Sequence, residues 1–282
     1  MVIDGIATRY EIRGDGAPLL MFSPGGFDAT LDKWTTIASY ARAGLIDHLT
    51  RHYRCIVFDR REAGQSGGRI EAVTWADYVR QGFGLLEHLG IARAHVIGGC
   101  MGCSIAIAFG VAHPDTARSL ILWWPVGGAK YRINSHQRFA EHVGFVKQNG
   151  LEAVVSLARN SDKSFGQDPR GGPWVAVLRR DEAFALTYVR QDIDCYVQLV
   201  SEMGRTLVDR DTSPGAEAEA LLRLQIPALV VPGRDATHAT SAARYLEECL
   251  PRAQYWDVPV EQQTAQNAPS RLLDFLLSAS RE

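Results

Sequence analysis

The sequence predicts an α/β protein built on a doubly wound, mostly parallel sheet, and two observations carry this prediction. Four short runs are almost continuously apolar, as is typical of strands that are buried on both faces of a parallel sheet: 54–58, 94–98, 119–124 and 227–231. Helical patterns lie between most of these runs, and strand–helix alternation is the signature of a sheet covered by helices on both sides.

The expected elements follow the chain in a regular order. Seven runs are candidate strands: 7–12, 18–22, 54–58, 94–98, 119–124, 227–231 and 254–258. Thr74 can cap a helix that runs to about Leu89, with Gly90 as its stop. Further helices are expected at 104–112, 240–250 and 269–277.

The stretch 125–220 interrupts this alternation. It holds amphipathic helical segments at 137–147, 151–159 and 181–203, separated by a polar loop at 160–173, and no convincing strand. We therefore expect residues 1–124 and 221–282 to form the core and residues 125–220 to form a helical cap. A cap of this kind would lie over the carboxyl ends of the strands, where open α/β sheets bind ligands, and it would be the most mobile part of the molecule.

Composition excludes several classes of partner. The formal net charge is −2, and nucleic acids and anionic membranes both require a basic face. The longest uncharged stretch, 96–112, is too short to span a membrane and holds four glycines. Five cysteines, few for the length and odd in number, together with an N-terminus that lacks an apolar signal core, predict a cytoplasmic protein. We expect a small-molecule substrate and leave a homodimer open.

The segment from His95 to Ser104, HVIGGCMGCS, is the most informative motif. A buried strand meets a helix through the pattern small–x–nucleophile–x–small, with Gly98 and Gly102 on either side of Cys100. A nucleophile on such a sharp turn has strained backbone angles, and side chains two residues away would collide with the neighbouring strand and helix. The helix N-terminus behind the turn supplies N–H groups and a partial positive charge, which favour a thiolate.

Here the chain resembles the α/β-hydrolase superfamily. The segment FSPGGF at 22–27 is similar to its oxyanion loop, and FDRREAGQS at 58–66 is similar to its Asp-x-Arg-Gly-x-Gly-x-Ser segment, with Glu62 where glycine is usual. The segment VPGRD at 231–235 resembles the strand end that bears the acid. The resemblance implies a hydrolase sheet of about eight strands with a helical cap, and it places the triad acid at Asp235.

The chain departs from this pattern at two positions. Cys100 stands where most members have serine. The dienelactone-hydrolase branch is similar to this chain in that it uses cysteine. The histidine expected after the last strand is missing: counting back from Pro269 leads to Gln262 or Gln263, and no histidine follows His238. We therefore take Cys100, Asp235 and His238 as the candidate catalytic residues, with His238 as a displaced base. Unless His238 reaches the site, we expect an acyl-enzyme on Cys100 to be hydrolysed slowly.

The remaining candidates come from position rather than from a specific motif. The backbone N–H groups of Gly26, Phe27 and Met101 are candidates for the oxyanion hole. Substrate contacts are expected from three side chains near the strand ends and the cap: Trp124, Trp174 and Gln262. No metal and no cofactor is predicted, because the histidines form no metal-site spacing. The histidines of the cap are expected on polar surfaces, and His95 at the periphery.

Each candidate also has a plain structural interpretation. Cys100 can be a small buried residue, Asp235 a turn cap, and His238 an exposed loop residue. Cys103 completes a Cys-x-x-Cys spacing that is found in redox dithiols, although it can equally be a packed residue in the first turn of the helix. For the protein as a whole, the alternatives are a catalytically inactive ligand-binding member of the same fold and a lyase or isomerase.

Overall fold

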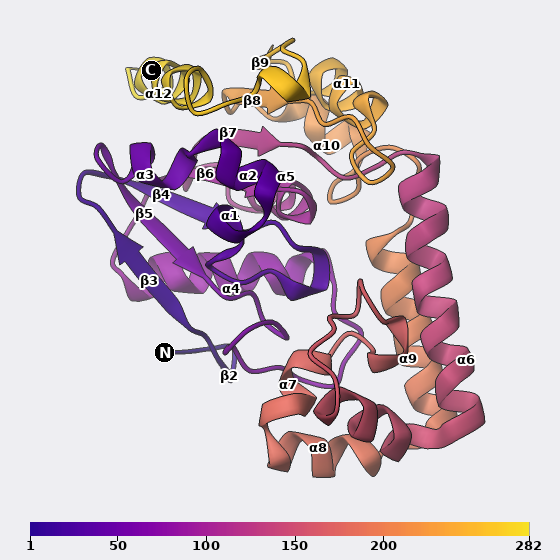
Figure 1. Ribbon diagram of the computed structural model, residues 1–282. Coiled ribbons are helices and arrows are strands. Elements are labelled where there is room, and N and C mark those ends of the chain that lie inside the picture. Colours follow the sequence, from indigo (N-terminus) through magenta and orange to yellow (C-terminus); the bar gives the residue numbers. More distant parts are fainter. Residues whose placement is uncertain (282) are drawn as a thin grey trace.

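A seven-stranded sheet forms the centre of the molecule in the computed structural model, which describes residues 1–281 (Figure 1). The strand order is β3-β5-β4-β6-β7-β8-β9, with β3 antiparallel to β5 and the other neighbours parallel. The strands are β3 (Tyr10–Arg13), β4 (Ala17–Phe22), β5 (Tyr53–Phe58), β6 (Ala94–Gly99), β7 (Ala117–Trp123), β8 (Ala228–Val231) and β9 (Ala253–Tyr255).

The seven strands correspond to the seven apolar runs of the sequence, so the expectation of about eight strands is corrected. The segment before β3 forms β1 (Val2–Ile3) and β2 (Ile6–Ala7), which pair only with each other. Because these two strands form their own small ladder, they add no eighth strand to the main sheet.

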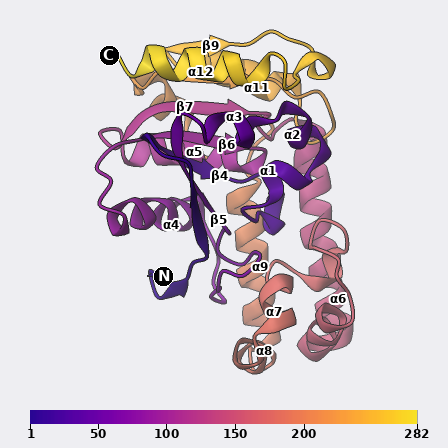
Figure 2. The ribbon, with the colours of Figure 1, turned by 60° about the vertical axis from the view of Figure 1, so that its left-hand side comes forward.

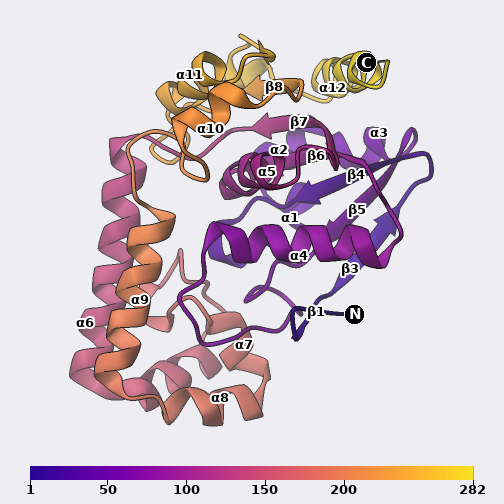
Figure 3. The ribbon, with the colours of Figure 1, turned by 180° about the vertical axis from the view of Figure 1, so that it is seen from behind.

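Alternate strand residues face two separate cores. On β4, Leu20 and Phe22 pack into one core, while Leu19 and Met21 pack into the other, as the two-residue period of a strand requires. The first core is covered by α4 (Trp75–His88), α5 (Met101–Ala112), α10 (Ala218–Arg223) and α11 (Thr240–Cys249), and Figure 3 shows α4 and α5 lying across the strands. The second core is covered by α1 (Lys33–Thr36), α2 (Ala38–Ala43), α3 (Leu45–Leu49) and α12 (Ala268–Ala279).

Local signals set the helix boundaries. The Thr74 hydroxyl accepts from the Asp77 N–H, and the Asp77 carboxylate accepts from the Thr74 N–H at 2.7 Å, which makes a capping box at the start of α4. The predicted helix at 74–89 is thereby confirmed. Helix α5 begins at Met101, three residues earlier than the apolar pattern indicated, because its first turn is part of the sharp bend at Cys100.

The insertion between β7 and β8 is helical, as predicted, and forms a separate layer beside the sheet (Figure 2). Helix α6 (Ala129–Arg159) bends at Gly150, whose φ of 79° is not helical, and packs against α9 (Ile193–Leu207). Between them lie η2 (Pro169–Gly171), α7 (Val175–Arg180) and α8 (Glu182–Val189). Helix α10 returns to the core, where it contacts α5 and α11. Within residues 1–281, no helix has the length and apolarity that a membrane span requires.

Candidate active site

Cys100 occupies a sharp turn between β6 and α5. Its φ of 55° and ψ of −125° are strained for a residue with a side chain, and it is the N-cap of α5. The flanking glycines are required by contact: a Cβ on Gly98 would lie 2.2 Å from the Gly102 carbonyl oxygen, and one on Gly102 would lie 2.2 Å from the Phe22 carbonyl oxygen. The backbone geometry expected of a nucleophile-bearing turn is therefore present.

His238 and Asp235 lie on the loop after β8, beside this turn. The Nδ1 atom of His238 lies 2.9 Å from Oδ2 and 3.0 Å from Oδ1 of Asp235. Oδ1 also accepts from the backbone N–H groups of Thr237 and His238, each at 2.8 Å. The carboxylate therefore fixes both the loop backbone and the imidazole ring. It does so at the surface, because the Asp235 side chain is 52% exposed while that of His238 is 12% exposed.

Continuations of β7 and β8 bring His238 toward Cys100. Beyond the strand ends, Gly127 forms a parallel bridge with His238, in which the Gly127 N–H donates to the Thr237 carbonyl at 3.1 Å. Gly233 allows the loop to close, since a Cβ there would lie 2.5 Å from the His238 Cβ. Strands β6, β7 and β8 are neighbours, so the two loops meet at one edge of the sheet.

The second ring nitrogen of His238 lies on the side where the ring interacts with the thiol of Cys100. Nε2 is buried and forms no well-aligned hydrogen bond within the described chain, and the group with which the ring interacts on that side is the thiol. Hydrogen bonds between a catalytic base and its nucleophile are often long or poorly aligned before the substrate binds. The structure thus brings together the three residues that the sequence analysis took as catalytic candidates.

The charges of this trio are coupled. Burial by itself raises the pKa of the Cys100 thiol, but the His238 imidazole and the backbone N–H groups of Met101 and Gly25 outweigh it, so the pKa falls below the ordinary value. Burial lowers the pKa of His238, but the charge of Cys100, the hydrogen bond to Asp235 and the charge of Asp235 raise that pKa to about 10. The hydrogen bond from His238 holds the pKa of Asp235 well below its usual range. These directions favour a thiolate–imidazolium pair.

Gln263 occupies the region where the resemblance implies a histidine. It is buried, and its amide has a structural set of partners: Oε1 accepts from the Trp124 indole at 2.6 Å, and Nε2 donates to the carbonyls of Pro232 at 2.9 Å and Val258 at 3.0 Å. The Trp124 ring in turn packs against His238, with centroids 5.7 Å apart. Gln263 and Trp124 therefore support the loop that carries His238.

Two backbone segments face the thiol. The N–H groups of Met101 and Gly25 interact with the sulfur, while Gly26 and Phe27 line the adjacent cavity at the start of η1 (Gly26–Asp28). Gly25 belongs to the segment 22–27 that resembles the oxyanion loop, and its φ of 119° is a left-handed conformation that glycine adopts without strain.

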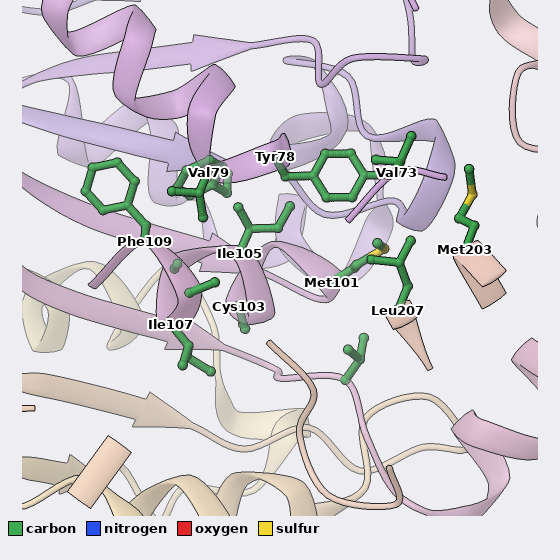
Figure 4. Close-up of a cluster of buried hydrophobic side chains, with 14 of the residues drawn as sticks. Val73, Tyr78, Val79, Met101, Cys103, Ile105, Ile107, Phe109, Met203 and Leu207 are labelled. Atoms are coloured by element: carbon green, nitrogen blue, oxygen red, sulfur yellow. The ribbon is translucent and has the colours of Figure 1, made fainter. Parts of the chain in front are cut away.

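A cavity of about 210 Å³ opens above Cys100, between the sheet edge and the insertion. Met101 of α5 and Leu207 of α9 line it, and Figure 4 shows their side chains in one cluster with Tyr78 of α4. Three aromatic rings close another side in mutual edge-to-face contacts: Phe27–Phe139 at 5.7 Å, Phe27–Phe165 at 5.2 Å and Phe139–Phe165 at 5.3 Å. The other lining residues include Val126, Tyr131, Ser135, Arg138, Val208 and Thr237.

Three predicted substrate contacts do not belong to this cavity. Trp174 is fully buried inside the insertion, where its indole donates to the Arg69 carbonyl at 2.8 Å. Gln262 is exposed at the end of η3 (Val260–Gln262), and Trp124 is held by Gln263 as described. The cap residues that do line the cavity repeat on α6 as Tyr131, Ser135, Arg138 and Phe139, a helical spacing that the sequence analysis did not use.

Cys103, the second cysteine of the motif, has the contacts of a packed residue. Cys103 is buried and its thiol donates to the carbonyls of Gly98 at 3.1 Å and Trp123 at 3.3 Å, as a packed residue in the first helical turn does. Over residues 1–281, no group of three or more His, Cys, Asp or Glu side chains is placed to hold a metal ion.

Comparisons with known proteins agree with this architecture. A sequence family described as "alpha/beta hydrolase fold" matches residues 18–149. The chain is 32% identical over 125 residues to the dihydrolipoyllysine-residue acetyltransferase component of the acetoin cleaving system of Cupriavidus necator, a match that covers 44% of this chain and only 31% of that protein. It is 22% identical to the 2-hydroxy-6-oxo-6-(2'-aminophenyl)hexa-2,4-dienoic acid hydrolase of Metapseudomonas resinovorans, over 82% of this chain and 72% of the relative.

Solved structures extend the similarity to almost the whole chain. The enol-lactonase of Burkholderia xenovorans LB400 superposes with a TM-score of 0.61 at 20% identity, covering 98% of each chain. A variant of the meta-cleavage product hydrolase of Pseudomonas fluorescens IP01 gives a TM-score of 0.59 at 17% identity, covering 98% of this chain and 96% of the other. At such identities the comparison concerns the fold alone.

Proposed function

From the α/β-hydrolase fold of this chain, we propose that it is a hydrolase or acyltransferase that acts on a small ester, lactone, thioester or related carbonyl compound through an acyl-enzyme on Cys100. The observation that carries the proposal is the position of His238, with one ring nitrogen bonded to Asp235 at 2.9 Å and the other on the side where the ring interacts with the Cys100 thiol. The hydrolases among the relatives and solved structures support a carbonyl substrate of this kind.

The first half-reaction starts from the ion pair. The Cys100 thiolate attacks the substrate carbonyl carbon, forming a carbon–sulfur bond while the carbonyl electrons move to the oxygen. The N–H of Met101, with N–H groups from the loop Gly25–Phe27, is placed to hold this oxyanion. When the intermediate collapses, the protonated His238 gives its proton to the leaving oxygen, nitrogen or sulfur, and the thioester remains.

The second half-reaction uses the same imidazole in the opposite sense. Neutral His238 accepts a proton from water, or from an acceptor alcohol or thiol, as that nucleophile attacks the thioester carbonyl. Collapse of the second intermediate returns Cys100 as a thiolate and His238 as an imidazolium. Asp235 stays ionised throughout and fixes the tautomer with the proton on Nδ1. Since His238 lies at the thiol, slow deacylation is no longer the expected behaviour.

Intact-mass spectrometry and product release with 4-nitrophenyl acetate test the proposal. The native protein should release nitrophenol catalytically and show a transient acetyl adduct on Cys100. Cys100→Ala should show neither. His238→Gln should still form the adduct, but the rate at which the adduct is hydrolysed should fall by about 10²–10⁴-fold, the usual contribution of a general base. His136→Gln, on the surface-side part of α6, is the matched control and should behave as the native protein.

Two results would overturn the proposal. Unchanged turnover in Cys100→Ala would mean that the thiol is not the nucleophile. Absence of both adduct and turnover with activated esters and thioesters would instead favour the ligand-binding alternative, and a ligand that is returned unchanged while it stabilises the protein against heat would establish it.

A further inference from the structure

The wall of the cavity above Cys100 holds one permanently charged side chain, the positively charged Arg138. Apart from the Cys100 thiol, Arg138 is the one lining side chain that bears a formal charge, and no Asp or Glu is among them. The other polar groups are the hydroxyls of Tyr131, Ser135 and Thr237, and the remaining wall is apolar or glycine. A guanidinium facing a largely apolar enclosure has a strong preference for an anion, because little water remains to solvate it.

Arg138 differs from the other arginines of α6. Arg132 pairs with Asp211 at 3.2 Å, and Arg159 pairs with Glu182, so both are neutralised at the surface. Arg138 has no hydrogen bond or ion pair to any part of the chain that the structure describes. Tyr131, Ser135, Arg138 and Phe139 share one face of the helix, which is the face that lines the cavity.

A second arginine adds positive charge near Tyr131. Arg60 follows β5 and is 97% buried, yet none of its three guanidinium nitrogens has a hydrogen-bond partner within residues 1–281. Its guanidinium lies 4.5 Å from the centroid of the Tyr78 ring, which Figure 4 shows in the same cluster as Met101 of the cavity wall. Burial raises the pKa of the Tyr131 hydroxyl, whereas the charges of both Arg138 and Arg60 lower it.

The carboxylate near Arg60 does not neutralise it. Glu62 lies within electrostatic reach, but its oxygens accept from the Arg61 guanidinium at 2.9 and 3.1 Å. A buried guanidinium without hydrogen bonds is a costly arrangement, and a negative charge in the cavity would offset part of that cost.

We infer that the substrate of the proposed reaction carries a carboxylate, or an equivalent anionic group, that binds Arg138. This inference rests on the proposed function. Tyr131 is within electrostatic reach of Cys100, and Arg138 lies seven residues farther along α6, a rise of about 10 Å. The anionic group is therefore separated from the reacting carbonyl by a chain of several bonds, and the acyl portion between them contacts the apolar wall.

Matched pairs of esters test the inference. The 4-nitrophenyl monoesters of adipic and suberic acid carry a terminal carboxylate, and the hexanoate and octanoate esters are their neutral counterparts. We expect kcat/KM for the monoesters to exceed that for the neutral esters, and Arg138→Gln to lower it by about 10- to 100-fold, the worth of a charge-assisted hydrogen bond. The neutral esters should change less than about twofold, because Arg138 takes no part in the chemistry.

Three further variants make the result specific. Arg138→Lys should retain part of the preference, and Lys147→Gln, which removes the same charge from an exposed position of α6, should retain all of it. Arg60→Gln should weaken the preference less than Arg138→Gln, since Arg60 is not among the residues that line the cavity. Free suberate should inhibit the native protein competitively and should inhibit Arg138→Gln weakly; circular dichroism confirms that each variant is folded.

The outcomes separate this inference from the function beneath it. If neutral esters acylate Cys100 and turn over, but the monoesters show no advantage or Arg138→Gln leaves that advantage intact, the inference is wrong and the proposed function stands. If no ester of either kind acylates Cys100, the proposed function is wrong, and the inference of an anionic substrate is wrong with it.

Discussion

At the scale of single residues, the proposed site depends on His238, which lies at a position other than the one that the superfamily pattern implies for the base. Base catalysis requires an imidazole nitrogen near the nucleophile and does not specify from which loop it comes. Asp235 and His238 are three residues apart, so one carboxylate can order both the loop backbone and the ring. Gln263, in the region usually held by the base, supports Trp124 and the loop carbonyls instead.

The coupling of Cys100 to His238 predicts an unusually acidic thiol. Its lowered pKa means that the thiolate persists as the pH falls below the ordinary thiol range toward neutrality. Alkylation by iodoacetamide, followed by mass at Cys100 in a Cys195→Ser background that removes the exposed thiol, should remain fast at pH 7. In His238→Gln, burial is the main influence on the Cys100 thiol. The pKa of the thiol should therefore rise, and its alkylation rate at pH 7 should fall by about tenfold or more.

A native alkylation profile like that of a simple thiol would contradict this prediction, and so would an identical profile in His238→Gln. His136→Gln is again the control for a histidine removed from the same protein. The comparison is independent of any substrate, so it tests the ion pair by itself.

At the scale of elements, the junction of β6 and α5 determines where Cys100 lies. The turn places Cys100 at the carboxyl end of the sheet only because strand, turn and helix approach one another at backbone distance. The sequence reveals this through two small residues, and the structure gives the reason: both would-be Cβ atoms point at carbonyl oxygens that cannot move.

Alanine at Gly98 should therefore be costly. A Cβ 2.2 Å from a backbone oxygen forces the helix away from the strand, which we expect to lower the free energy of unfolding by at least about 1–3 kcal/mol and to displace Cys100. Urea unfolding measures the first effect, and the iodoacetamide rate measures the second. Gly144→Ala, on α6 with open space around it, is the matched control and should stabilise by about 0.5–1 kcal/mol. Equal stability of Gly98→Ala and the native protein would show that the junction is not tightly packed.

The loop 160–173 is the element expected to control entry to the cavity. Phe165 anchors it through edge contacts with Phe27 and Phe139, while residues 162, 163, 166 and 167 beside it are exposed. Amide hydrogen exchange should be faster in this loop than in β6 and β7, and Phe165→Ala should accelerate it further by removing the anchor. Strong, uniform protection of the loop in the native protein would argue against its acting as a lid.

At the scale of the whole molecule, two histidines expected at surfaces are buried in separate cores, so that expectation was wrong. His95 bonds to the hydroxyls of Ser119 at 2.7 Å and Ser280 at 3.1 Å. His142, inside the insertion, bonds to the Arg170 carbonyl at 3.0 Å and to the Tyr196 hydroxyl at 2.7 Å. Burial lowers the pKa of each to about 4. Protonation of either ring therefore works against the folded state.

The linkage has a definite sign for His142. Its pKa is about 4 when folded against 6.5 when exposed, so its contribution to stability is full above pH 6.5 and is lost as the pH falls toward 4. The unfolding free energy lost in His142→Phe should thus be largest at neutral pH and should shrink by about 3 kcal/mol by pH 4. Urea unfolding of both proteins across this range measures it, and other titrating groups cancel in the difference. A difference that is independent of pH would mean that His142 is not buried as a neutral ring.

The sequence by itself determined the architecture, because local patterns encode it. Seven apolar runs became seven strands, Thr74 capped its helix, and Gly98 and Gly102 marked the turn at Cys100, since burial, capping and backbone contact each act over a few residues. It also supplied the trio Cys100, Asp235 and His238 as candidates. The eighth strand failed because it was expected from resemblance and not from an apolar run.

Only the tertiary structure decided which side chains meet. Whether His238 reaches Cys100 depends on the space left by Gly233 and on the bridge between Gly127 and His238, which joins segments about a hundred residues apart along the chain. The same holds for the cavity wall: Trp174 and Arg138 both lie in the insertion, yet the fold buries the first and places the second on the wall of the cavity above Cys100. Local sequence fixes what each element is, whereas the closing of long loops fixes what each element touches.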